Sequence, residues 1–272
     1  MDWLSNWDDL VHGTVVFAAA VPFLVAGGVA WLWPERLWVA LVVGLGASLA
    51  WLFGWPEIPP GSSDDAMVTA LVVGVVVVGL GRIAKLGWWR WVIGVVLWCG
   101  VGWLLYPAWL EVDGGVGKRA LVCSLMAVSI VGTGRLAGWG CGVKEAARSS
   151  GWVLVVPTAG LAALLQMGGS TQFTQTAGAL AAALVGVMLV LWKKGRGEMK
   201  WCGDFWGMMF AVLAWSGWLF AEVSVAAVMV VAVAAGGGIL IGKKSGVVVS
   251  VVLSAVAVWM GWMVYGGGSE GY

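Results

Sequence analysis

The stretch Lys193-Lys194-Gly195-Arg196-Gly197-Glu198-Met199-Lys200 holds the densest positive charge of this 272-residue sequence. Two apolar runs flank it, residues 176–192 and 201–221. Each run has close to the ~20 residues with which a helix crosses the hydrocarbon core of a bilayer. Because cytoplasmic loops of membrane proteins collect Lys and Arg, we place this loop inside the cell. Because the chain changes sides with every span, this assignment also sets the side on which every other loop lies.

The composition predicts a membrane protein. The chain is 61% hydrophobic and only 11% charged, and its mean hydropathy is +0.95. Soluble domains carry about 25% charged residues. The apolar residues come in long blocks rather than at amphipathic spacing, which favours membrane spans over a large soluble core. The charges form no basic face, so we expect the lipid bilayer, and not a nucleic acid, as the partner.

We predict an all-α, polytopic bundle of about ten transmembrane helices with short loops. The segments leave almost no room for a soluble domain, so residues 1–272 are expected to form a single transmembrane domain. Short connections make sequential helices antiparallel neighbours. A tight turn near Glu222 must split the apolar tract of residues 201–242. The predicted spans are residues 13–33, 36–55, 66–81, 88–106, 120–139, 151–168, 176–192, 201–221, 223–241 and 246–265.

The distribution of charge supports this number of helices. The loops after spans 1, 3, 5, 7 and 9, together with the span ends beside them, hold 13 of the 15 Lys and Arg residues, and only Lys118 and Arg119 fall on the other side. An incorrect number of helices would scramble this alternation. Both termini are therefore predicted outside the cytoplasm, and the membrane is expected to be a bacterial cytoplasmic (inner) membrane.

The 22 tryptophans are the most unusual feature of the composition. Most of them fall near the ends of the predicted spans. An indole has an apolar body and one N–H donor, so it prefers the level of the lipid headgroups. We interpret these residues as an interfacial belt rather than as an aromatic ligand cage. Trp98 is the exception, because it lies near mid-span, where its N–H needs a partner within the protein.

Small residues recur four apart on three of the predicted helices. Such faces let two helices approach closely, and dispersion and Cα–H contacts then replace the missing hydrophobic drive. They predict packing within the chain, between copies, or with a membrane partner. The three faces are Gly178, Ala182 and Gly186; Gly203, Gly207 and Ala211; and Ala234, Gly238 and Gly242.

Most catalytic and cofactor chemistry is missing from the sequence. The single histidine, His12, excludes a haem held by two histidines and a multi-histidine metal site. The four cysteines form no C-x-x-C pair, which favours buried or reduced thiols. No nucleophile–base motif is present. We predict no catalytic residue, no cofactor and no metal, and an enzyme is the least favoured class.

Ionisable residues within the predicted spans are scarce. Arg135 lies about one turn from the inner end of its span and can extend its side chain to the interface. Asp204 lies in the first turn of its span beside Lys200, where the helix dipole favours an acid. Both have structural explanations, so the sequence does not favour a proton- or sodium-coupled mechanism.

Two prolines, Pro22 and Pro157, lie near the middle of predicted spans 1 and 6. A proline there removes a backbone hydrogen bond and frees a carbonyl group. The uncharged polar residues Thr158 and Gln166 follow the second proline. We take Pro22, Pro157, Thr158 and Gln166 as a candidate substrate path. The alternative is a packing kink beside a polar outer loop.

The positions of the two prolines raise the hypothesis of two halves, residues 13–139 and 151–265, related as an inverted repeat. In helix number and loop length the chain resembles transporters of the drug/metabolite type, which have ten short helices in two halves of five. The termini of that family are usually cytoplasmic, unlike those predicted for this chain, and no motif carries the resemblance.

We expect a small-solute permease or exporter. The alternative is a non-catalytic integral membrane subunit or scaffold, which would meet its partner or a second copy through the small-residue faces. A cavity at mid-membrane that is lined by polar groups would favour the permease.

Overall fold

The structure is a computed structural model that describes residues 18–54, 63–82, 86–104, 115–142, 147–194, 199–221, 223–241 and 243–265. Within these residues the chain forms ten α-helices and one short 3₁₀ helix, without a strand. The elements are α2 (Val21–Leu32), η2 (Pro34–Arg36), α3 (Leu37–Phe53), α4 (Ser63–Arg82), α5 (Trp89–Leu104), α7 (Gly115–Gly142), α8 (Ala147–Met167), α9 (Thr171–Lys194), α10 (Met199–Phe220), α11 (Val225–Ile241) and α12 (Lys243–Tyr265).

The ten helices coincide with the ten predicted segments, so the all-α fold is confirmed. Four helices are long and apolar enough to cross a membrane, and these are Pro34–Phe53, Gly115–Gly142, Thr171–Lys194 and Ser245–Tyr265. Five further apolar helices are shorter, with 10–17 residues. The bundle therefore contains helices compatible with a membrane, whereas ten complete spans remain a prediction.

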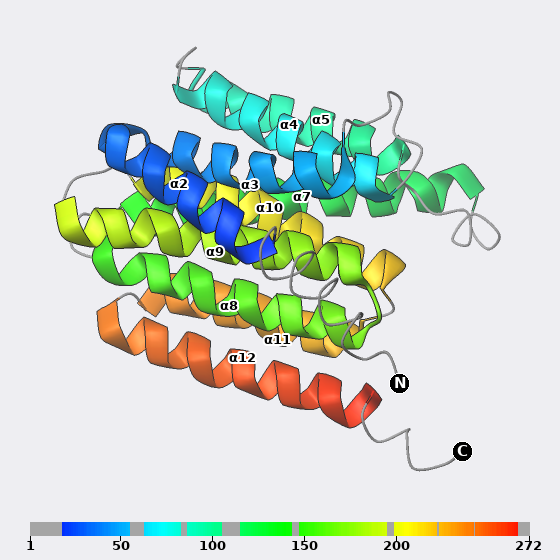
Figure 1. The fold of residues 1–272 in the computed structure, drawn as a ribbon. Coiled ribbons are helices and arrows are strands. Elements are labelled where there is room, and N and C mark those ends of the chain that lie inside the picture. Colours follow the sequence, from blue (N-terminus) through cyan, green and yellow to red (C-terminus); the bar gives the residue numbers. More distant parts are fainter. Residues whose placement is uncertain are drawn as a thin grey trace.

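Successive helices run antiparallel, and their long axes are roughly aligned (Figure 1). As a result, α2, α4, α7, α9 and α11 finish at the same end of the bundle, which we call the basic end. There, Lys194 at the end of α9 donates a hydrogen bond to the Trp31 carbonyl of α2. Arg82 at the end of α4 donates to the Glu35 carbonyl. The loop residues 195–198 and Glu222, and most residues of the two termini, lie outside the described residues.

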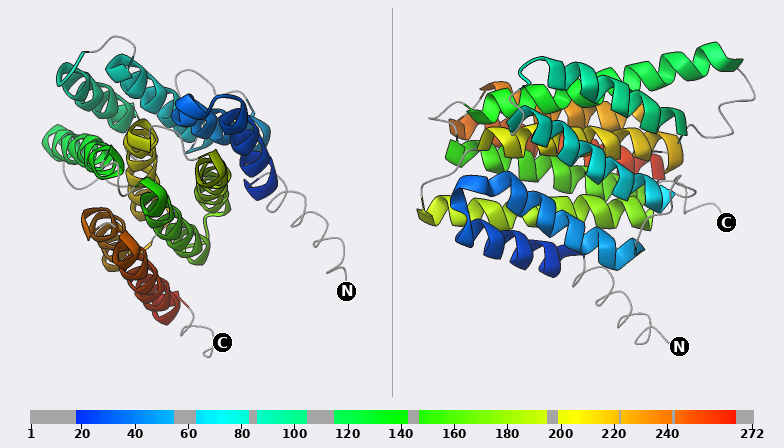
Figure 2. Two further views of the ribbon diagram at one scale, coloured as in Figure 1. Left: turned by 90° about the vertical axis from the view of Figure 1, so that its left-hand side faces the viewer. Right: turned by 90° about the horizontal axis from the view of Figure 1, so that it is seen from above.

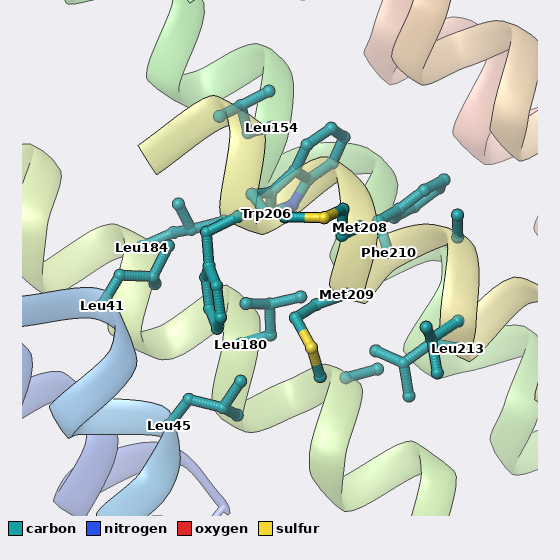
Figure 3. Packing of buried hydrophobic residues seen from close by; sticks show 14 of the residues in the cluster. Leu41, Leu45, Leu154, Leu180, Leu184, Trp206, Met208, Met209, Phe210 and Leu213 are labelled. Atoms are coloured by element: carbon teal, nitrogen blue, oxygen red, sulfur yellow. The ribbon is translucent and has the colours of Figure 1, made fainter. Parts of the chain in front are cut away.

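Helix α10 lies at the centre of the bundle, and its residues 202–213 are buried around the whole circumference of the helix. It packs against α3, α4, α7, α8, α9 and α11 (Figure 2). Leucines of α3, α8 and α9 gather around its apolar side chains (Figure 3). Among the largest fully buried side chains are Trp206, Phe205 and Phe210, all of which belong to this helix.

The small-residue faces make contacts within the chain, as one of the predicted alternatives required. A Cβ atom built on Gly207 would lie 2.6 Å from the Thr133 carbonyl oxygen of α7, and one on Gly203 would lie 2.6 Å from the Ala137 carbonyl oxygen. Gly186 of α9 comes equally close to the backbone of α2. Gly238 of α11 packs against α8 and α12. At these contacts only glycine allows the backbones to approach so closely.

The helix neighbours differ between the two proposed halves. In the second half α12 packs along α8, whereas the corresponding helices of the first half, α7 and α2, are not among the packed pairs of the described chain. The strongest contact between the halves joins α7 to α10. A two-fold relation would require a matching contact between α4 and α12, which the described helices do not form. The packing therefore gives no support to an inverted repeat.

Gly207→Ala should destabilise the protein, because the added methyl group meets backbone atoms of α7 that cannot rotate away. We expect a loss of about 1–3 kcal/mol, as for other overpacked interiors, measured by thermal unfolding in detergent micelles. The matched control is Gly132→Ala on α7, where a Cβ atom has no neighbour within 4 Å. The control should melt with the parent or slightly above it. Equal melting of the Gly207 variant would show that α7 and α10 are not in close contact.

Candidate functional site

The structure does not bring Pro22 and Pro157 together. Pro22 lies on α2 and Pro157 lies inside α8, and α9 packs against both helices. Packing of α2 on α8 is not seen among the described helix pairs. The four residues of the predicted substrate path therefore do not line one common cavity.

Pro22 has a local role in packing. It occupies the first turn of α2, directly after a π-helical turn at residues 18–20. A proline at that position disturbs no α-helical hydrogen bond, because the first N–H groups of a helix have no intrahelical partner. The Pro22 carbonyl lies against Gly44 of α3, where a Cβ atom would come within 2.8 Å of it. The residue thus helps α2 to pack tightly on α3.

Thr158, directly after Pro157, is a fully buried polar residue. Its Oγ1 hydroxyl donates a hydrogen bond to the Leu154 carbonyl at 2.7 Å. The same oxygen accepts the indole N–H of Trp206 at 2.8 Å. Thr158 is therefore a structural link between α8 and α10. Gln166, in contrast, is exposed near the end of α8.

A partly open groove of about 400 Å³ lies between α7, α10 and α11. It has the size of a small-molecule site, and such sites are mostly apolar with few polar groups. In the described lining there is no charged side chain. The lining residues, which define the α7–α10–α11 groove, are Ser129, Thr133, Leu136, Trp206, Phe210, Ala211, Ala214, Trp215, Trp218, Val225, Val228, Met229, Ala232, Ala235, Gly236 and Ile239.

Four aromatic side chains of α10 form one wall of this groove. The rings of Trp206 and Phe210 stack, with centroids 4.9 Å apart and an interplanar angle of 25°. Trp215 and Trp218 meet edge to face at 5.4 Å. Trp206, Phe210 and Trp218 share one helix face at multiples of four residues, and Trp215 lies three residues before Trp218 on the adjoining side. The hydrogen bond that Trp206 donates to Thr158 of α8 fixes the orientation of the Trp206 ring in this wall.

Two hydroxyl groups of α7 provide the polar side of the groove. Ser129 Oγ donates to the Met126 carbonyl at 2.8 Å and accepts the indole N–H of Trp215 at 2.7 Å. Thr133 Oγ1 donates to the Ser129 carbonyl at 2.8 Å. Both hydroxyl protons are thus engaged within helix α7. The groove can bind an apolar molecule, but it offers nothing that would compensate the burial of a charge.

A buried ion pair lies outside the groove, near the basic end. Arg90 of α5 and Asp204 of α10 approach to 3.0 Å between Nη2 and Oδ2, with side chains only 8% and 2% exposed. The Arg90 guanidinium lies 4.1 Å from the ring centroid of Trp91 and 4.7 Å from that of Trp201. These rings replace part of the solvation that the cation loses on burial.

Two glycines make room for the ion pair. A Cβ atom on Gly138 of α7 would overlap the Asp204 carboxylate, and one on Gly81 of α4 would overlap the Arg90 guanidinium. The pair therefore joins α5 to α10 and is enclosed by α4 and α7. Such a pair orients helices more reliably than it stabilises them, because desolvation offsets much of the attraction.

The sequence did not predict these features. Arg90 lies at the cytoplasmic end of predicted span 88–106, among the basic residues assigned to that side, and the helix dipole already explains Asp204. One signal was present: Asp204 is the acid within a span at the end of the bundle where basic residues gather. The groove left no signal in the sequence, because its lining is as apolar as the outward-facing sides of the same helices.

The structure also corrects the expectation for Trp98. Its side chain is completely buried, but its Nε1 atom has no hydrogen-bond partner among the described residues. The ring instead fills the space where α5 packs on its neighbours. The four cysteines are free, as predicted, and three of them are buried.

No known family model matches this chain, and no curated protein matches its sequence.

Removing one partner of the ion pair should destabilise the protein more than replacing both partners by apolar residues. Asp204→Ala leaves the Arg90 guanidinium buried without its carboxylate, so we expect a loss of about 3–5 kcal/mol. The double variant Arg90→Met with Asp204→Leu should recover most of this loss, because neither charge is then buried. Thermal unfolding in detergent is the measurement, with Lys193→Met on α9 as an exposed control. If Asp204→Ala unfolds with the parent, the two side chains do not pair.

Proposed function

We propose that this chain is a multi-pass protein of a bacterial cytoplasmic membrane that binds an apolar solute in the α7–α10–α11 groove, as a permease or exporter would. The observation that carries the proposal is the groove itself, with about 400 Å³ of space beside four aromatic side chains. Lipophilic molecules concentrate in the bilayer, so a groove between helices that is partly open can receive its solute from the lipid.

The lining supports a narrower solute class than the sequence did. A permease for polar solutes needs polar groups along its path. The lining of the groove is almost entirely apolar, and its two hydroxyl protons are already donated to backbone carbonyls. An apolar solute loses little on leaving the lipid for such a lining, and it gains contacts with the aromatic wall.

A second candidate function is the non-catalytic membrane subunit or scaffold. The observation in its favour is the close packing of α10, whose glycines touch the backbone of α7. A helix held in this way is suited to a rigid framework. A scaffold would leave the groove to ordinary lipid and would show no preference among small ligands.

The topology can be tested with fusions. Because 13 of the 15 basic residues lie on one side of the predicted spans, alkaline phosphatase fused after Gly61 or at the C-terminus should be active. The same enzyme fused after Gly195 should be inactive, since it requires export. Activity after Gly195 would reverse the proposed orientation, and activity at only one of the outer sites would contradict ten spans.

The groove can be tested with a neutral fluorescent probe, N-phenyl-1-naphthylamine, and protein in lipid nanodiscs, with empty nanodiscs as the blank. We expect saturable binding to the parent. Gly236 lines the groove, and a Cβ atom there has no neighbour within 4 Å. Gly236→Leu should therefore fill the groove without disturbing the fold and weaken probe binding about tenfold or more, the equivalent of ~1.4 kcal/mol.

The matched control is Gly132→Leu, which also enters open space but lies outside the groove. This variant should bind the probe as the parent does, and both variants should melt normally. Saturable binding that survives Gly236→Leu would place the probe elsewhere. A parent that does not bind the probe beyond the nanodisc blank would favour the scaffold.

A further inference from the structure

We propose that the solute of the α7–α10–α11 groove is an uncharged aromatic molecule that carries a hydrogen-bond donor, and that Thr133 accepts this hydrogen bond. The inference rests on the proposed function and names the substrate class and the residue that selects it. It follows from counting which donors and acceptors of the groove are already used.

Two of the three indole N–H groups in the groove already donate hydrogen bonds within the protein. Trp206 donates its N–H to Thr158, behind the wall. Trp215 donates its N–H to Ser129. Among the described groove residues only Trp218 keeps its indole N–H, and it packs edge-on against Trp215. A ligand that can only accept hydrogen bonds therefore finds few free donors in the groove.

The hydroxyl oxygens of the groove, in contrast, can still accept hydrogen bonds. A hydroxyl oxygen donates one proton and has two lone pairs that can accept. Ser129 Oγ has given its proton to Met126 and already receives Trp215. Thr133 Oγ1 has given its proton to the Ser129 carbonyl and accepts no hydrogen bond from the described residues. Among the described lining residues, Thr133 is therefore the hydroxyl with two lone pairs free to accept, whereas Ser129 Oγ has one left.

The shape and charge of the groove define the rest of the ligand. Trp206 and Phe210 present stacked rings along one wall, and offset stacking favours another flat ring. An ionised group would lose its hydration and find no counter-charge in the described lining. A phenol- or arylamine-like molecule fits these conditions, whereas an aryl carboxylate does not.

Three naphthalenes of nearly equal size can test this assignment by displacing N-phenyl-1-naphthylamine from protein in nanodiscs. They are 2-naphthol, which donates, 2-methoxynaphthalene, which only accepts, and 2-naphthoate, which is anionic. After correction for partition into empty nanodiscs, 2-naphthol should bind about 2- to 10-fold more tightly than 2-methoxynaphthalene, the range of one neutral hydrogen bond. The anion should not displace the probe.

The variant Thr133→Val keeps the shape of the side chain and removes the acceptor. It should abolish the preference for 2-naphthol while leaving the affinity for 2-methoxynaphthalene unchanged. Thr133→Ser should restore the preference, which a merely structural role of the threonine would not predict. Trp218→Phe should leave the preference intact.

Each alternative result has a distinct meaning. Equal binding of the two neutral naphthalenes, or a preference that survives Thr133→Val, would overturn this inference but leave the groove as an apolar site. Tighter binding of 2-methoxynaphthalene that is lost in Trp218→Phe would make the protein the donor and also overturn it. Failure of the parent to bind the fluorescent probe at all would instead refute the proposed function.

Discussion

The close approach of α10 to α7 is the contact on which the rest of the structure depends. Gly203 and Gly207 bring the backbone of α10 against the carbonyl groups of Ala137 and Thr133. Backbones that approach this closely make many short dispersion contacts, which together stabilise the pair of helices. A helix held in this way can be buried on all sides, as residues 202–213 of α10 are. The other central helices take their positions from it.

The ion pair depends on the same contact. Because Gly138 has no side chain, the Asp204 carboxylate fits between α10 and α7 and still reaches Arg90. A charge at this depth is tolerated only when its partner is in place, so the pair makes the position of α5 conditional on that of α10. Trp91 and Trp201 flank the cation and complete the site. The pair therefore sets the arrangement of helices at the basic end rather than forming part of the groove.

The groove results from an uneven packing around α10. Helix α7 lies close to α10 through glycines, whereas α11 packs closely on α12 and α8 and makes few contacts with α10. The space left between them is lined by the aromatic face of α10. Thr158 holds Trp206 from behind and Ser129 holds Trp215 from the side. These hydrogen bonds give the rings fixed orientations, and they use the donors that a ligand would otherwise meet.

The sequence by itself determined the approximate positions of the ten described helices, their antiparallel order, and the faces on which glycine allows close contact. These follow from local quantities: the length of apolar runs, the shortness of loops, and four-residue spacing. Only the tertiary structure decided which helices become neighbours. Pro22 and Pro157 of the candidate substrate path lie on α2 and α8, and α9 packs against both helices. The burial of Arg90, the unpaired Trp98 and the groove were likewise decided there. The physical reason is that helices apolar on every side carry no pattern that distinguishes a face turned to a neighbour from a face turned to lipid.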